Sequence, residues 1–573
     1  MNARLLLFTL LLIGCRTAPP VEPADLILHH GVVWTGDGNL PRAEAVAVRG
    51  AYVVAVGSDG DVLALRGPST EVIDLGGAFV VPGFNDNHTH FASAARFLEF
   101  NIMTASSQDE FVDRLRRLTA RLPKGEWILG GYWGAYDQWA RGSAGGAGRQ
   151  PFTPDMRVVE DITRDHPTFI RKFDDSEFAA NRAALRAAGV DPDHPFAPDV
   201  EFAGNGILRG AGVLRLFEKV VPRTFSRERR LEQTRNALAE IRRSGVTGIS
   251  DMSDDEQLDL FRQLRDQGEL TVRVHFRYPL ERWKELADRG IRADSDDPWI
   301  RLGALKGHID GIMGNSTARF FEPYEHDPQN RGRWRPLMVA GTLKNHLLDA
   351  DRAGLQVSIH AIGDEANSVL LDYLDELSRT NGARDRRFRL VHAQVVRPSD
   401  FPRMKGVVAE VQPFHLSDDM RWMEERIGAE RSRGAYAFRS LRDHGAILSF
   451  GSDWPGTSAA EYPINPLLGL YAAVTRQTTT GTPKEGWFPD QRISIEDALR
   501  AYTWGTAYGN HEEEVKGTIA AGKLADITVL SKNLLEVPPA EILTTRVLYT
   551  IVGGKVLDLG GSRVQPARPV DAQ

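Results

Sequence analysis

The stretch Phe79-Val80-Val81-Pro82-Gly83-Phe84-Asn85-Asp86-Asn87-His88-Thr89-His90 joins a strand-like apolar run to two histidines one residue apart. Side chains two residues apart on an extended chain point to the same side, so His88 and His90 offer two imidazoles to one point. Taken alone, this spacing is also compatible with a turn that merely contains two histidines. The choice depends on which side chains the rest of the chain brings to the same place.

The bulk composition indicates a globular protein with more than one domain. The chain has 573 residues, which is too long for a single ordinary hydrophobic core. Hydrophobic residues make up 42% and charged residues 26% of the sequence, as is usual for globular proteins. The net charge is only -7 and no basic run with interleaved aromatic residues occurs, so no nucleic-acid partner is expected.

The amino terminus has the pattern of an export signal. A short apolar run from Leu5 to Ile13 follows Arg4 and is too short to span a bilayer. The run ends in Leu12-Ile13-Gly14-Cys15, and Cys15 is the only cysteine of the chain. This resembles the lipobox of bacterial lipoproteins, in which the cysteine is lipidated and becomes the first residue of the mature chain. An ordinary secretory signal with an incidental cysteine is the alternative.

We therefore predict a signal peptide and lipobox over residues 1–15, with lipidation of Cys15, and a proline-rich tether over residues 16–24. Lipidation of the sole cysteine would leave no thiol for disulfides or metal binding. The expected location is the cell envelope. Because Arg16 provides no retention signal for the inner membrane, we expect the outer membrane, facing the periplasm, in a cell with two membranes.

Both ends of the mature chain have the texture of a small β-domain. Short apolar strands alternate with glycine-rich turns from Asp25 to Gly77 and again from Asp526 to Leu557. Near the carboxyl end, Gly553-Gly554 lies between two apolar runs and is a hairpin signal. We predict one β-sandwich domain composed of residues 25–80 and 515–562.

Between these ends, buried-looking strands alternate with amphipathic helices, for example over residues 227–243, 364–378 and 433–444. Eight strands alternating with helices predict an α/β fold, a closed parallel TIM-like (β/α)8 barrel, over residues 81–514. The segment from about 101 to 222 is too long for one crossover. We predict it as an insertion after the first barrel strand, near the active-site face. Besides the run before His88, the predicted strands are 246–250, 271–276, 300–306, 356–360, 388–392, 407–411 and 446–450.

Barrel enzymes carry their chemistry at the carboxyl ends of the strands. Six suitable side chains fall at or just after predicted strand ends: His88, His90, Lys306, His360, His392 and Asp453. Each alone has an ordinary explanation, such as a hydrogen-bonded core histidine, a lysine that reaches solvent or an aspartate that caps a helix. Their joint placement on one rim is the argument for a metal site. Imidazole and carboxylate ligands suit zinc and similar divalent ions.

Lys306 adds a specific chemical property to this set. It closes an apolar strand, where an ammonium group is poorly solvated and its pKa is lowered. A neutral lysine amine can capture carbon dioxide as a carbamate. That reaction turns a cation into a bidentate anion able to bridge two metal ions.

With these residues in place, the sequence resembles the amidohydrolase superfamily. Within it, the chain is similar to the family-3 branch of metal-dependent hydrolases related to N-substituted formamide deformylase. The resemblance covers nearly the whole mature chain. Its carriers are residues 81–90, Lys306 with Asp310-Gly311 and Thr317-Ala318, Ile359-His360-Ala361-Ile362-Gly363-Asp364, Val391-His392-Ala393-Gln394, Val411-Gln412-Pro413 with His415, Gly451-Ser452-Asp453-Trp454-Pro455, Gly517-Thr518-Ile519 and Ala521-Gly522-Lys523-Leu524-Ala525-Asp526.

The resemblance implies two divalent ions, zinc by ligand type, and a role for each residue. His88, His90 and Asp453 would bind one ion. His360 and His392 would bind the second, and Lys306, as its carbamate, would bridge the two. A hydroxide held between the metals would attack a substrate carbonyl. Asp453 would take its proton and pass it to the leaving nitrogen.

A weaker implication concerns His415, in the loop after the seventh strand, which would contact substrate. A surface-loop histidine without that role is equally consistent with the sequence.

Two departures from the family pattern fall in the insertion. Where relatives often show Asp-Gly-His ahead of an asparagine, this chain has Asp174-Asp175-Ser176 and then Asn181. A family glutamate after Gly206-Ile207-Leu208-Arg209 is Gly210 here. Both positions are expected near a substrate pocket or lid, so no named substrate is carried over.

The function that the sequence predicts is metal-dependent hydrolysis of an amide or N-acyl carbon–nitrogen bond outside peptides, in a small-molecule substrate. Hydrolysis of an ester, a lactone or a cyclic imide by the same site is an alternative. A lipid-anchored envelope binding protein without turnover is a second alternative, although the complete set of six ligands argues against it. The oligomeric state is open, a homo-oligomer included.

Overall fold

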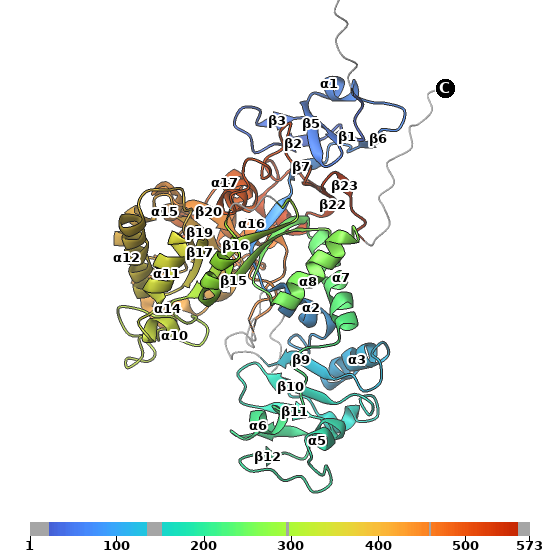
Figure 1. The fold of residues 1–573 in the computed structure, drawn as a ribbon, viewed down its shortest axis with the longest axis vertical. Coiled ribbons are helices and arrows are strands. Elements are labelled where there is room, and N and C mark those ends of the chain that lie inside the picture. The colour runs from blue at the N-terminus through green and yellow to red at the C-terminus, as the bar shows by residue number, and fades with distance from the viewer. Residues whose placement is uncertain (1–21, 135–151, 294–296, 458–459, 560–573) are drawn as a thin grey trace, which may run out of the picture.

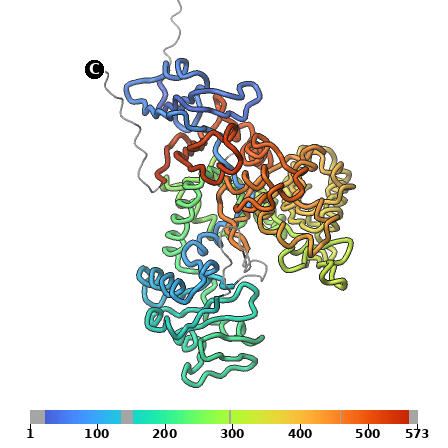
Figure 2. Tube along the Cα trace, turned by 180° about the vertical axis from the view of Figure 1, so that it is seen from behind, coloured from blue at the N-terminus to red at the C-terminus, as the bar shows by residue number. Residues whose placement is uncertain are grey.

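The computed structural model describes residues 22–134, 152–293, 297–457 and 460–559. A barrel occupies the middle of the molecule, with a β-sandwich at one end and the inserted lobe at the other (Figure 1). The view from behind shows that the first strands and the last strands of the chain lie side by side in the sandwich (Figure 2). The predicted lipidation residue Cys15 lies outside the described residues.

The central sheet has the predicted parallel order, β8-β14-β15-β16-β17-β18-β19-β20. The first and last strands are joined by a parallel bridge between Thr89 and Trp454 and by a hydrogen bond of 2.5 Å from Asn87 Nδ2 to Ser449 O. The TIM-like fold class is therefore confirmed. The strands are β8 (Phe84–Thr89), β14 (Val246–Asp251), β15 (Arg273–Pro279), β16 (Ile300–His308), β17 (Gln356–Ala361), β18 (Arg389–His392), β19 (Val408–Val411) and β20 (Ile447–Phe450).

Helices cover the outside of this barrel, and two of the predicted boundaries shift. The helix predicted over 364–378 runs to Asn381. The helix predicted over 433–444 begins only at Phe438, because Tyr436 has a left-handed φ of 49° that interrupts a helix. The main helices are α2 (Phe91–Glu99), α7 (Arg227–Arg243), α8 (Asp255–Asp266), α9 (Trp283–Asp288), α11 (Leu343–Arg352), α12 (Asp364–Asn381), α14 (Met423–Ser432), α15 (Phe438–Asp443), α16 (Pro466–Thr475) and α17 (Ile495–Arg500).

The apolar run before His88 is divided between two sheets at Gly83. Residues Phe79–Pro82 form β7 of the sandwich, and the first barrel strand begins at Phe84, later than the sequence indicated. Gly83 donates its N–H to Asp526 O at 2.8 Å. A Cβ at Gly83 would lie 2.2 Å from Thr247 Oγ1, so the crossing from sandwich to barrel has room only for glycine.

The sandwich consists of two sheets with a shared apolar core. One has the order β5-β4-β1-β6 and the other β23-β22-β21-β7-β2-β3, so the second sheet contains strands from both chain ends. In that sheet, Val80 of β7 pairs with Val529 of β21 in antiparallel register. The strands are β1 (Leu26–His29), β2 (Val32–Trp34), β3 (Arg42–Ala43), β4 (Ala45–Arg49), β5 (Tyr52–Gly57), β6 (Glu71–Asp74), β7 (Phe79–Pro82), β21 (Ile527–Leu530), β22 (Val547–Val552) and β23 (Lys555–Val556).

The insertion after α2 forms a sheet of its own with the order β12-β13-β11-β10-β9. Its buried core includes Phe111, Leu115 and Trp133, and its edge strand β9 lies next to α2 of the barrel (Figure 1). The elements of the lobe are α3 (Gln108–Thr119), β9 (Ile128–Trp133), β10 (Thr168–Lys172), β11 (Phe178–Ala180), α5 (Arg182–Ala187), β12 (Glu201–Phe202), β13 (Ile207–Arg209) and α6 (Val213–Phe217).

None of the helices in the described ranges combines the length and the apolar character that crossing a bilayer requires.

Candidate metal centre

Backbone hydrogen bonds hold the His88–His90 segment of β8 against the Asp453 loop that follows β20. Asp453 N donates to His88 O at 2.9 Å, and His90 N donates to Trp454 O at 2.8 Å. The buried Asp86 carboxylate accepts the N–H groups of both His88 and Ser452, each at 3.0 Å. Burial raises the pKa of Asp86 to about 7, although these hydrogen bonds oppose the shift. Together, these hydrogen bonds join the His88–His90 segment and the Asp453 loop into one frame.

The frame brings three potential ligand groups to one point. Ligand atoms of His88, His90 and Asp453 all lie within 4.8 Å of one another. The Nε2 atoms of His88 and His90 lie 3.4 Å and 3.2 Å from the same atom, Asp453 Oδ1. Burial acts to raise the pKa of Asp453, but the hydrogen bond and the charge of His90 lower it overall. A carboxylate between two imidazoles is a donor set that suits a divalent ion.

The two remaining histidines, His360 and His392, lie beside this group but are not part of it, and their hydrogen bonds indicate their tautomers. His360 Nε2 lies 2.9 Å from Gly311 O, and a carbonyl can only accept, so Nε2 carries the proton and Nδ1 keeps its lone pair. His392 Nδ1 lies 2.7 Å from Gln412 Oε1, which leaves the lone pair on Nε2. The rings of His360 and His392 are 4.5 Å apart, and His88 is 5.0 Å from His392. Such outer hydrogen bonds orient histidine ligands for a metal.

The ionisation state of these rings also fits metal binding. Burial lowers the pKa of His88, His360 and His392, and that of His360 falls to about 3. The imidazoles are therefore neutral near pH 7, and only the neutral ring has a lone pair to give a metal.

The sequence predicted Lys306 at the end of its strand. In the structure it lies inside β16, two residues before the end. Its side chain is buried, with an exposed fraction of 6%, and its Nζ lies 3.5 Å from His88 Nε2. Among the described residues it forms no ion pair with a carboxylate. Burial, and then the charge of Arg277, lowers the pKa of Lys306 to about 7. The amine is therefore partly neutral near pH 7, as capture of carbon dioxide requires.

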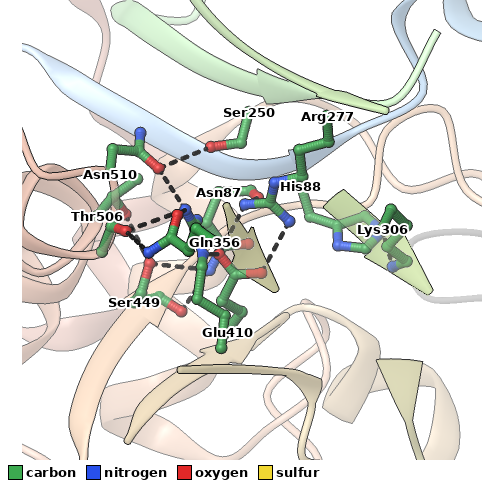
Figure 3. A network of polar contacts seen from close by, with 12 residues as sticks. Asn87, His88, Ser250, Arg277, Lys306, Gln356, Glu410, Ser449, Thr506 and Asn510 are labelled. Carbon is green, nitrogen blue, oxygen red and sulfur yellow. Dashed lines mark hydrogen bonds and ion pairs between the residues drawn. The ribbon is translucent and has the colours of Figure 1, made fainter. Parts of the chain in front are cut away.

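A buried polar network supports the centre from inside the barrel (Figure 3). Arg277 donates to Asn87 O at 2.9 Å, next to His88, and to both oxygens of Glu410 at 2.7 Å and 2.8 Å. Arg389 donates to the same carboxylate and, at 2.7 Å, to Asn510 Oδ1. The side chains of Arg277, Arg389 and Glu410 are fully buried. Strands β8, β15, β18 and β19 are thus tied together beneath the metal ligands.

His415 is not a surface residue. It is the first residue of the short helix α13 (His415–Asp419), is buried, and stacks on Tyr462 with ring centroids 3.9 Å apart. Its Nε2 lies 3.2 Å from Ser452 O, in the residue before Asp453. His415 therefore adjoins the loop that carries Asp453, and its contact with substrate stays a prediction.

Two other residues lie near the centre: the sequence did not single out His308, and it named Asp310 only as part of a family motif, without a role. His308 ends β16, and its ring lies 5.2 Å from that of His360. It is two residues after Lys306 in the same strand, so the alternation of strand side chains was a usable signal. Asp310 accepts the N–H groups of Arg319, Ile362 and Gly363 at 2.8–3.1 Å and positions the loop after His360.

A pocket of about 670 Å³ opens beside the His88–His90–Asp453 group. His90, Pro455 and Gly456 line it on the barrel side, and residues of β9, β10 and α6 line it on the side of the lobe. The two positions at which the chain departs from its relatives, Ser176 and Gly210, were expected near substrate but do not line this pocket.

Comparison with known proteins agrees with this architecture. A model of the amidohydrolase family matches residues 71–558. The chain is 33% identical to Protein LONG AFTER FAR-RED 3 of Arabidopsis thaliana over 94% of its own length and 93% of that protein. It is 24% identical to N-substituted formamide deformylase of Arthrobacter pascens over 92% of its length and 97% of that enzyme. An uncharacterised metal-dependent hydrolase of Pyrococcus horikoshii superposes with a TM-score of 0.71 at 27% identity, covering 90% of this chain and 99% of the other. With its barrel and its histidine–aspartate group, the chain belongs to the amidohydrolase family of metal-dependent hydrolases.

Proposed function

We propose that the protein hydrolyses a non-peptide carbon–nitrogen bond, an amide or N-acyl bond, in a small molecule. Two divalent ions, zinc by ligand type, would be held by His88, His90 and Asp453 on one side and by His360 and His392 on the other. Lys306, as its carbamate, would lie between them.

The observation that carries this proposal is the position of Lys306. A buried lysine without a carboxylate partner is costly unless its charge is removed or used. Here the amine is 3.5 Å from one candidate metal ligand, and its lowered pKa favours the neutral form that adds to carbon dioxide. Addition would bind the amine nitrogen to the carbon, release a proton and leave an anion between four imidazoles.

The residues then have separable tasks. Bound divalent ions would supply Lewis acidity, which makes water more acidic and polarises a carbonyl group. Asp453, held by His88 and His90, would accept a proton from the attacking water and return it to the leaving nitrogen as the carbon–nitrogen bond breaks. Gln412 and the carbonyl of Gly311 would keep the rings of His392 and His360 in place.

Replacement of Asp453 by asparagine tests this proton-transfer role. Asp453→Asn keeps the size of the side chain but removes its basicity, so kcat on the best N-acyl substrate of a screen should fall by about 10²–10⁴. The matched control is Asp443→Asn, an exposed aspartate beside Arg442, which should leave kcat unchanged. An Asp453→Asn protein with nearly normal kcat would assign proton transfer to another group.

The relatives support hydrolysis of a carbon–nitrogen bond, but they do not determine which bond this protein cleaves. The deformylase of Arthrobacter pascens is named for N-substituted formamides. Hydrolysis of an ester, a lactone or a cyclic imide by the same residues is the competing function. Kinetics on amide and ester pairs that share an acyl group distinguish the two, since a carbon–nitrogen hydrolase should prefer the amide once the uncatalysed rates are taken into account.

We further propose that Cys15 anchors the enzyme to the outer membrane, facing the periplasm. The support is the sequence alone: a short apolar run after Arg4 that ends in the sole cysteine of the chain.

A further inference from the structure

The pocket beside His90 has an unusual charge for this protein. The described residues that line it include four arginines, Arg96, Arg171, Arg223 and Arg230, and two carboxylates, Glu218 and Asp254. By residue count the lining is positive, whereas the whole chain has a net charge of -7; two acids just outside the lining, Asp175 and Glu256, contact Arg171 and Arg230. A concave surface with an excess of one charge attracts ligands of the opposite charge.

Arg230, Arg171 and Arg96 differ in how far nearby carboxylates already neutralise their charge. Arg230 is neutralised, because it bonds to Asp254 at 2.7 Å and also contacts Glu256. Arg171 reaches Asp175 only at 3.4 Å and Tyr132 Oη at 3.4 Å. Arg96 forms no ion pair with any described residue, and its one hydrogen bond, 3.4 Å long, goes to the carbonyl of Ala92 in its own helix. Arg96 and Arg171 therefore retain donors for a ligand.

The position of Arg96 relates it directly to the metal centre. His90 is the residue just before α2, Ser93 and Arg96 lie three residues apart within the helix, and all three line the pocket. Six residues of helix span about 9 Å, and helical side chains lean back toward the amino terminus. The guanidinium of Arg96 is thus within the length of a small molecule from His90.

The lining also contains apolar side chains. Phe169 of β10 stacks on Phe217 of α6, with ring centroids 4.1 Å apart, and both line the pocket together with Val221 and Phe225. His90, at the inner end, is 40% exposed in its side chain, so the candidate metal centre is open to this space. The pocket therefore combines a candidate metal ligand, apolar side chains and two guanidinium groups with unused donors.

We propose that this pocket binds the non-reacting part of the substrate, and that this part is an apolar chain or ring that ends in a carboxylate bound by Arg96 and Arg171. The inference rests on the proposed hydrolysis of an N-acyl bond and specifies its substrate class. Guanidinium groups bind carboxylates through paired, charge-assisted hydrogen bonds, which neutral tails of equal size cannot form. The enzyme would act on anionic N-acyl compounds in preference to their neutral analogues.

Matched substrates test the selectivity. N-acyl amines whose apolar tail ends in a carboxylate are compared with the same compounds ending in a carboxamide, using the metal-loaded enzyme and kcat/KM. We expect the carboxylate to be preferred by about tenfold or more, and Arg96→Gln to reduce that ratio to near one. Arg171→Gln should reduce it in part. Arg116→Gln, an exposed arginine of α3 outside the pocket, should leave the ratio unchanged. An equal preference for both tails in the unmodified enzyme would overturn the proposal.

Binding of a tail without a scissile bond separates this inference from the proposed function. Calorimetry with 4-phenylbutyrate and 4-phenylbutyramide reports on the pocket even if no N-acyl substrate is hydrolysed. If 4-phenylbutyrate binds more tightly than the amide, and if Arg96→Gln weakens this binding while Arg116→Gln does not, the subsite is supported. This result holds even if no N-acyl substrate is hydrolysed. If Arg96→Gln binds 4-phenylbutyrate as tightly as the unmodified protein does, the proposed subsite is refuted. The proposed reaction is not affected by that result.

Discussion

Lys306→Ala should lose at least about 100-fold in activity and a large part of its bound metal. The substitution removes the group that we expect to lie between two divalent ions. Among the described residues, the one polar contact of its amine is with His88 Nε2 at 3.5 Å, so no other side chain replaces it. Short carboxylic acids such as formate or acetate should restore part of the activity, because a carboxylate has the charge and the two oxygens of a carbamate. The measurements are kcat/KM with and without added acid and the metal content of each variant.

A matched control uses Lys344, which is partly exposed and pairs with Glu376. Lys344→Ala should keep its activity and its metal, and added acids should have no effect on it. Normal activity in Lys306→Ala would refute the bridging carbamate and would favour a single ion bound through His88, His90 and Asp453.

Glu410→Gln should destabilise the barrel by about 3–5 kcal/mol. The carboxylate of Glu410 is fully buried between Arg277 and Arg389, and it is the only acid that the two guanidinium groups contact among the described residues. Burial acts to raise the pKa of Glu410, but Arg277 and then Arg389 lower it overall, so the folded protein holds an ionised acid. A neutral amide would leave two buried cations without compensation. Chemical denaturation followed by circular dichroism measures the change.

The comparison for this variant is Glu496→Gln, which removes an exposed pair with Arg42. Exposed pairs contribute up to about 1 kcal/mol, so this control should shift the unfolding transition little. Equal shifts in the two variants would show that the network inside the barrel does not stabilise it. Because Arg277 also holds Asn87 O next to His88, Glu410→Gln should in addition lower the affinity for metal.

The fold was predictable because its strands are apolar runs that end in turns and alternate with helices. The division of the apolar run at Gly83 was not predictable, because both halves of the run are apolar. The break is caused by the approach of Thr247, which comes from a distant part of the chain. The sheet of the inserted lobe was equally hidden. Its strands are short and order themselves through contacts that no local pattern encodes, such as the parallel pairing of β9 with β10.

The ligand residues were predictable because the barrel brings strand ends to one rim. The contacts that hold these ligand residues in place were not predictable from the sequence. Arg277 and Arg389 lie within strands, where charged side chains usually mark an exposed face, yet they point into the barrel and find Glu410 there. The tautomers of His360 and His392 depend on Gly311 O and Gln412 Oε1, partners that only folding reveals. The two arginines with unused donors in the pocket, Arg96 and Arg171, likewise come from the barrel and from the lobe and meet only in the fold.

The metal content of the protein expressed without residues 1–15, determined by elemental analysis, tests the central claim most directly. The account predicts about two divalent ions per chain and less in Lys306→Ala. One ion per chain would contradict the bridged pair and would leave Lys306 with a structural or substrate-binding role. No bound ion, even after reconstitution with zinc and bicarbonate, would contradict the metal-dependent chemistry that we propose for this chain.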